Sequence, residues 1–138
     1  MGASAAPAID RSARLAEGWL ASPALTLEEA RDQAAFYLER CKAHGRTPTA
    51  VAIRRDIYVG ESVADADAVV ERVLTAGYRG LPPSALIAGP VARVVERFSA
   101  LAALGYTDII VRHLTDDHPK VLGSLARLRE VREALASV

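Results

Sequence analysis

The chain has 138 residues, of which 51% are hydrophobic and 25% charged, a composition typical of one globular domain spanning residues 1–138. Seventeen basic side chains balance seventeen acidic ones, so the net charge gives no reason to expect a nucleic acid or an anionic membrane as partner. The lone cysteine, Cys41, excludes an internal disulfide and a cysteine-based zinc site. No apolar run approaches the roughly 18 residues that span a bilayer, and the first residues lack a signal-peptide pattern, which predicts a cytoplasmic protein.

The first quarter of the sequence predicts a helix, a very short strand and a second helix. Ser4 is placed as the N-cap of the first helix, which ends at Gly18, and residues 18–21 form the strand. A capping box opens the second helix, with Thr26 as N-cap and Glu29 reaching back to the amide of that residue.

The next segment changes from helical to strand periodicity. Residues 50–59 alternate apolar and polar side chains, and their β-branched content predicts a strand. The apolar members of this alternation are Val51, Ile53, Ile57 and Val59. Ser62 then begins a helix that Gly77 closes.

The last third begins with the most loop-like part of the chain, residues 77–89, which is rich in glycine and proline. Pro90 stands at the first position of the following helix, and Gly105 ends that helix. Residues 107–114 form a continuous apolar run, as expected for a buried parallel strand, and a final helix follows Pro119.

Strands that alternate with helices of ten residues or more predict an α/β fold with a parallel sheet and right-handed crossovers. The sequence predicts three strands. A parallel sheet of that size leaves apolar surface and two unpaired edges that another part of a protein must cover.

Several short stretches, in this order along nearly the whole chain, resemble luciferase-like flavin-dependent monooxygenases and oxidoreductases. They are Gly2-Ala3-Ser4, the segment 10–19 ending in Trp19, Tyr78-Arg79-Gly80, Gly89-Pro90, and the segment 105–114. The resemblance implies a partial (β/α)8 barrel of the TIM type, consisting of the last three parallel strands with their helices. It also implies FMN or a deazaflavin coenzyme, bound at the C-terminal ends of the strands.

A full barrel of this kind takes roughly 250 residues. On the resemblance, this chain begins in the loop after the fifth strand, and five of the eight strands have no counterpart in it. It therefore cannot close a barrel alone.

The stretch Gly2, Ala3 and Ser4 is the candidate cofactor-binding site. Free backbone N–H groups, the helix dipole and the Ser4 hydroxyl together suit a phosphate at the start of a helix. A plain N-cap behind a flexible chain start is the alternative interpretation.

Arg55 is a candidate contact for substrate or phosphate because it shares the apolar face of its strand with Ile53 and Ile57. An arginine in a barrel interior is costly unless it is paired, so its presence there suggests a function. The alternative is a bulge or strand end that lets Arg55 reach solvent or the neighbouring Asp56.

Four further residues are candidates for substrate or phosphate contacts. Arg112 and His113 end the last strand, where barrel strands point into the active-site mouth, and His113 suits proton transfer near neutral pH. Tyr78 and Arg79 lie in a loop that suits a lid. A polar strand exit and a solvated connector are the alternatives, and no spacing of histidines or carboxylates predicts a metal site.

Two functions remain open from the sequence. In the first, the chain is part of a flavin-dependent oxidoreductase and meets the missing strands on a longer polypeptide or on a complementary fragment. In the second, it is a non-catalytic half-barrel that homodimerises and binds a flavin or another anionic ligand. Neither assigns a catalytic residue, and neither selects FMN over the deazaflavin.

Overall fold

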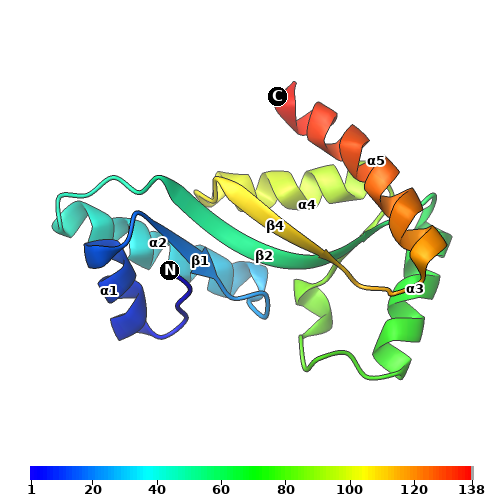
Figure 1. Cartoon of the computed structure of the whole chain (residues 1–138), viewed down its shortest axis with the longest axis horizontal. Coiled ribbons are helices and arrows are strands. Elements are labelled where there is room, and N and C mark those ends of the chain that lie inside the picture. Colours follow the sequence, from blue (N-terminus) through cyan, green and yellow to red (C-terminus); the bar gives the residue numbers. More distant parts are fainter. Residues whose placement is uncertain (138) are drawn as a thin grey trace.

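The structure, a computed structural model, describes residues 1–137 and consists of a four-stranded sheet with helices around it (Figure 1). The helices are α1 (Ala6–Leu15), α2 (Leu27–Ala43), α3 (Val63–Thr75), the 3-10 turn η1 (Pro83–Ala85), α4 (Val91–Ala103) and α5 (His118–Ala136). The strands are β1 (Gly18–Ala21), β2 (Ala50–Val59), β3 (Ile87–Gly89) and β4 (Asp108–His113). None of the helices within residues 1–137 has both the length and the apolar character needed to cross a membrane.

The long strand β2 is the centre of the sheet, and all strand pairs are parallel. β4 pairs along one edge of β2. The other edge is shared, because β1 pairs with its first part and β3 with its last three residues. Gly2 adds one parallel bridge to Leu20 on the outer edge of β1. The predicted α/β class with a parallel sheet is confirmed, and the carboxyl ends of all strands point in one direction.

The number of strands differs from the prediction. Residues 87–89 were expected to end a loop, but they form β3, whose Ile87 pairs with Ile57. Three residues between prolines and a glycine carry too little periodicity to predict a strand, and pairing with the end of β2 creates it. The predicted strand 107–114 is present as β4. However, it is not buried, since Ile110 is 47% exposed and β2 is its only partner within residues 1–137.

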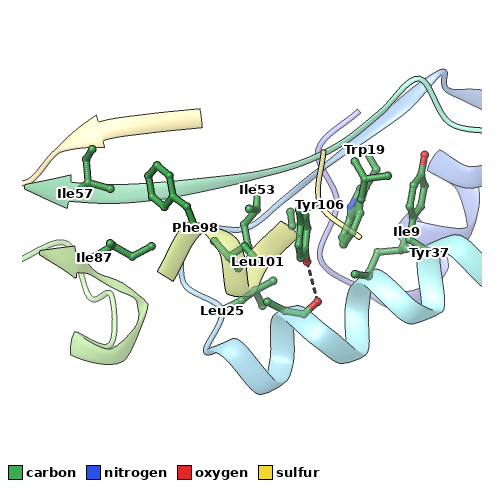
Figure 2. Close-up of a cluster of buried hydrophobic side chains, with 14 of the residues drawn as sticks. Ile9, Trp19, Leu25, Tyr37, Ile53, Ile57, Ile87, Phe98, Leu101 and Tyr106 are labelled. Carbon is green, nitrogen blue, oxygen red and sulfur yellow. Dashed lines mark hydrogen bonds between the residues drawn. The ribbon is translucent and has the colours of Figure 1, made fainter. Parts of the chain in front are cut away.

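One face of the sheet, carrying the odd-numbered residues of β2, is covered by α1, α2, α4 and α5. Its core contains Ile53 and Ile57 of β2 with Phe98 and Leu101 of α4 (Figure 2). At the other end of this core, aromatic rings of different elements meet. The Trp19 ring centroid lies 4.9 Å from that of Tyr37 and 6.2 Å from that of Tyr106. The Tyr106 hydroxyl also donates to the carbonyl of Ala30 at 2.8 Å, which fixes α2 against the chain before β4.

The opposite face, carrying the even-numbered residues of β2, is covered only near the end of the strand. There α3 and the segment leading to β3 form a second, smaller apolar cluster. Its buried members are Tyr58, Ala66, Val69, Leu86 and Leu114. Towards the start of β2 and along β4 this face is open, which is why Ile110 is exposed.

Local capping explains where most helices begin. The Thr26 and Ser62 hydroxyls accept from the backbone N–H three residues later, as predicted, although Glu29 contacts the Thr26 hydroxyl rather than its amide. The predicted N-cap Ser4 is wrong by one residue. Ala5 caps α1 without a side-chain hydrogen bond, because Met1 and Ala3 are held beside β1 by hydrogen bonds to Leu20. Pro90 is itself the N-cap of α4 rather than its first residue.

The final helix α5 is fixed to the sheet through buried polar contacts. The backbone N–H of Val59 donates to the Ser124 hydroxyl at 2.8 Å, and Arg127 Nε donates to the Val59 carbonyl at 2.7 Å. Lys120 Nζ lies 3.3 Å from Asp65 Oδ1, which links α5 to α3. The contacts of Ser124 and Arg127 thus provide hydrogen-bond partners for the N–H and C=O of Val59, the last residue of β2.

We expect Ser124→Ala to lower the free energy of unfolding by about 1 to 3 kcal/mol, because it leaves the buried N–H of Val59 without an acceptor. Urea unfolding followed by circular dichroism measures this change. Ser137→Ala is the control, since that exposed hydroxyl bonds only to Ala134 in the same helix, and its effect should stay within about 0.5 kcal/mol. Equal effects of the two substitutions would contradict the role of Ser124.

Acid should weaken the link between α3 and α5. Burial opposes ionisation of Asp65, but the N–H of Glu61, the hydroxyl of Tyr58 and the ammonium of Lys120 outweigh it and hold its pKa below the ordinary 3.8. Because the folded-state pKa is the lower one, the stabilisation is complete above the ordinary value and is lost as pH falls through the folded one.

The stability difference between the native chain and Asp65→Asn should therefore be constant near neutral pH and shrink as pH falls below 3.8. Urea unfolding at a series of pH values measures it, and Asp67→Asn, an exposed position on the same helix, controls for the loss of a charge. A difference that grows on acidification would refute this account.

Candidate functional site

Charged and aromatic side chains gather on the open face of the sheet, at the middle of β2 and near the end of β4. Arg54 and Asp56 come from β2, and Arg112 of β4 is the register partner of Asp56. Tyr78 comes from the segment between α3 and η1. These four residues are called the open-face cluster below.

The carboxylate of Asp56 is the centre of this cluster and is fully buried. The Tyr78 hydroxyl donates to its Oδ2. Arg54 Nε lies 3.3 Å from its Oδ1, an ion pair by distance, but the direction is unsuitable for a hydrogen bond. Both of these atoms therefore lack a hydrogen-bond partner within residues 1–137. Buried polar atoms left in this way are uncommon and call for a missing water, ion or ligand as an explanation.

The Tyr78 side chain acts as a hydrogen-bond donor and not as a base. Burial and, after it, the hydrogen bond and negative charge of Asp56 raise its pKa to about 12, although Arg112 and Arg54 oppose this rise. At neutral pH the phenol keeps its proton. It can hold Asp56 in place, but it does not accept a proton from a ligand.

The backbone around Tyr78 adopts the left-handed conformation at three neighbouring positions. Gly77 and Gly80 have φ angles of 82° and 68°, and Arg79 between them has a φ of 48°. Such a φ is uncommon for a residue with a side chain. The loop thus brings Tyr78 inward to Asp56 and leaves Arg79 exposed, so the structure separates these two predicted candidates.

Arg55 lies away from the open-face cluster, on the helix-covered face of β2. It is 2% exposed, and its Nη1 donates to the carbonyl of Pro23 at 3.1 Å. Burial lowers its pKa, and the charge of Arg97 acts in the same direction. It reaches neither solvent nor Asp56, because consecutive residues of a strand point to opposite faces. Its buried charge is a feature of the packing between the sheet and its helices.

His113 also points to the helix-covered side, since its register partner is Ile57. Its Nε2 lies 2.8 Å from the hydroxyl oxygen of Ser124. That hydroxyl accepts from the N–H of Val59, so its own proton is available for Nε2, which assigns the proton of a neutral ring to Nδ1. Burial lowers the pKa of His113, so the ring is neutral at physiological pH and is held by α5.

The Gly2-Ala3-Ser4 stretch runs beside β1, where Gly2 bridges to Leu20 and the N–H of Ala3 donates to the Leu20 carbonyl. The carbonyl of Ala3 accepts from Trp19 Nε1 at 2.9 Å, and Ser4 behind it is exposed. The N–H groups of Ala8 and Ile9 already bond to Ala5, and Pro7 has none. Few backbone N–H groups at the start of α1 therefore remain free to bind a ligand, and the Ser4 hydroxyl is the side-chain donor there.

Sequence reasoning missed Arg54 and Asp56. They were noted only as polar members of the alternation in residues 50–59, and Asp56 is buried. No local signal marks this group, because Arg112 reaches Asp56 only through the register between β2 and β4. No group of three His, Cys, Asp or Glu residues in the described part of the chain is arranged to hold a metal ion.

No family model matches the sequence, and no curated protein matches it either. Solved structures do match. The coenzyme F420 dependent tetrahydromethanopterin reductase from Methanopyrus kandleri is 18% identical, with a TM-score of 0.62 over 82% of this chain and 44% of its own. The oxygenating constituent of 3,6-diketocamphane monooxygenase from Pseudomonas putida, in complex with FMN, is 17% identical, with a TM-score of 0.67 over 90% of this chain and 44% of its own. Flavoprotein 390 is 12% identical, with a TM-score of 0.71 over 99% of this chain and 67% of its own.

The chain thus spans less than half the length of the first two structures, and at these identities the likeness concerns the fold. The matching structures are luciferase-like monooxygenases and F420-dependent oxidoreductases, and the chain therefore has part of the luciferase-like fold.

Proposed function

We propose that the chain is the C-terminal part of a luciferase-like flavin-dependent oxidoreductase or monooxygenase. In this role it contributes a wall of a (β/α)8 barrel and a contact for the cofactor phosphate. The observation that carries the proposal is the open-face cluster. In such a barrel the helices lie outside and the active site lies at the carboxyl ends of the strands. Here α1, α2, α4 and α5 cover the odd-numbered face of β2, whereas the charged groups Arg54, Asp56 and Arg112 lie on the other face.

The proposed cofactor is FMN or a deazaflavin coenzyme, because one neighbour is described with FMN and another as F420-dependent. The residues present fit the phosphate-bearing, anionic part of such a cofactor. The exposed Ser4 hydroxyl at the start of α1 suits a phosphate, and Arg54 and Arg112 supply positive charge on the open face. When bound, the cofactor supplies the redox chemistry.

The chain's own residues position charged groups for a ligand and exclude water from Asp56. Tyr78 covers Asp56 from one side and keeps this carboxylate away from water. The buried carboxylate in turn attracts the guanidinium of Arg54, which stays partly exposed and suits an anionic group of a ligand. No proton transfer is assigned to His113, because its Nε2 is held by Ser124 on the helix-covered side.

A second function deserves a test because the chain spans 67% of flavoprotein 390, a larger share than the 44% that it spans of the tetrahydromethanopterin reductase. In this alternative the chain is a non-catalytic half-barrel that homodimerises and binds a flavin. Both functions need the remaining surface of the barrel from outside residues 1–138, either on a longer polypeptide, on a complementary fragment or on a second copy. They differ in whether the assembled protein turns over a substrate.

Cofactor binding is the first test. We expect the purified chain, titrated with FMN and with a deazaflavin coenzyme, to bind one of them with a dissociation constant on the order of tens of micromolar or below. Absorbance after gel filtration and fluorescence quenching measure this binding. Protein that stays colourless and changes neither signal at that concentration would remove the half-barrel that binds a flavin by itself.

The phosphate contact is tested by combining Ser4→Ala with Gly2→Val. A side chain at Gly2 would meet only the carbonyl oxygen of Leu20, at 3.9 Å, so the fold tolerates it. Loss of a hydroxyl and of close backbone approach should weaken FMN or deazaflavin binding about tenfold or more, since hydrogen bonds to charged groups contribute about 1.5 to 3 kcal/mol. Ser137→Ala is the control at the far end of α5, and equal affinities of both variants would remove this assignment.

A further inference from the structure

A buried histidine that the proposed function does not use lies where α5 is attached to the carboxyl ends of β2 and β4. His113 Nε2 lies 2.8 Å from the hydroxyl oxygen of Ser124, which is 0% exposed. The N–H of Val59 donates to the same oxygen at 2.8 Å, and Arg127 Nε donates to the Val59 carbonyl at 2.7 Å. The side chains of His113, Ser124 and Arg127, with the backbone of Val59, are called the α5 joint below.

The hydrogen bonds of the α5 joint suit a neutral imidazole ring. A serine hydroxyl has one proton to donate and two lone pairs that accept. The Val59 N–H uses one lone pair, and the proton of Ser124 goes to His113 Nε2. Protonation turns Nε2 into a donor, so the Ser124 proton loses this acceptor. The acceptor that a helical serine otherwise reaches is the carbonyl four residues earlier, here that of Lys120, which the helix already uses.

The charged side chains around this end of β4 do not favour a protonated ring either. His113 forms no ion pair within residues 1–137. The acids Asp65 and Glu61 lie near the cations of α5 instead, at 3.3 Å and 3.8 Å. The charged groups of β2, α4 and α5 on this side of the sheet are cations, namely Arg55, Arg97, Lys120 and Arg127. A proton on His113 would therefore add a positive charge without a counter-ion.

We propose that the α5 joint is a proton-sensitive contact, in which uptake of a proton by His113 weakens the attachment of α5 and loosens residues 59–61 at the carboxyl end of β2. Gly60 in this segment donates to the Gly89 carbonyl at the end of β3, and Ser62 directly after it caps α3. Loosening would thus reach the carboxyl ends of two strands. An effect of pH on cofactor binding there rests on the proposed function, whereas the joint itself does not.

The direction of the pH effect follows from burial. Burial lowers the pKa of His113 below the ordinary 6.5. Because the folded-state pKa is the lower one, the stabilisation by the neutral ring is complete above 6.5 and is lost as pH falls towards the folded value. The equilibrium constant for opening of the joint should rise over this range. The total rise should equal the ratio of the acid dissociation constants of the ring in the closed and open states.

Two measurements on the 138-residue chain test the proposal. Carbon and nitrogen chemical shifts of the His113 ring give its titration and its tautomer, and hydrogen exchange at the Val59 amide gives the opening constant at each pH. In His113→Gln an amide oxygen can accept from Ser124 but does not titrate. His118→Gln, at an exposed position at the start of α5, is the control for loss of a histidine. Ser124→Ala removes the donor to the ring.

We expect the native ring to titrate below 6.5 and to carry its neutral-state proton on Nδ1. The opening constant at Val59 should rise on acidification from 6.5 in the native chain and in His118→Gln, and it should stay constant over the same range in His113→Gln. Ser124→Ala should raise the pKa of His113, because the neutral ring loses the hydrogen bond that favours it.

A ring that titrates at 6.5 or above would overturn the proposal. So would a His113→Gln variant that keeps the native pH dependence at Val59, because another group would then control the opening. An unchanged pKa of His113 in folded Ser124→Ala would show that burial alone acts on the ring and would overturn the role of the joint. Circular dichroism checks the folding of each variant, and the His113→Gln comparison decides alone where Ser124→Ala does not fold. Neither measurement uses a cofactor, so this proposal and flavin binding can fail separately.

Discussion

The backbone N–H and C=O groups of a central strand point alternately to its two edges and need partners on both. The central strand β2 finds these partners in three different strands. β4 serves one edge, while the other is divided, since β1 reaches Ile53 and β3 begins at Ile57. Residues 54–56 lie in the interval between them. The open-face cluster and the buried Arg55 both arise in this interval, and the Pro23 carbonyl, just after β1, accepts from Arg55 there. The buried charged residues of β2, Arg55 and Asp56, therefore lie where neither β1 nor β3 pairs with this strand.

The helices and the long strands could be predicted because their signals are local. Thr26 and Ser62 bond to amides three residues away, so the sequence near each contains the whole interaction. β3 could not be predicted in this way, because its three residues become a strand only by pairing with Ile57 to Val59. Ser4 failed as an N-cap for a similar reason. The start of α1 is set by hydrogen bonds between the first residues and Leu20, which is distant in sequence.

The candidate site was predicted only in part, because periodicity does not say which face of a strand the helices will cover. The alternation in residues 50–59 was correct, but Arg55 was interpreted either as a barrel-interior residue or as one that reaches solvent or Asp56. It is instead buried beneath the helices, because α2 and α4 lie on the face of Ile53. Tyr78 and Arg112 were identified as candidates. That both lie beside Asp56 was not predicted. Their position depends on a loop with an unusual backbone conformation and on the register between β2 and β4, and neither is a local property of the sequence.

Arg112 belongs both to the open-face cluster and to the free edge of β4, and this has a consequence for any assembled form. The residue that a pairing strand places opposite Arg112 decides the net charge near Asp56. A partner that offers an acid opposite Arg112 compensates this guanidinium and leaves Arg54 as the main positive group for a ligand. A partner that offers a neutral residue leaves both arginines to attract an anion. Completion of the sheet and the ligand preference of its open face are therefore linked through one side chain.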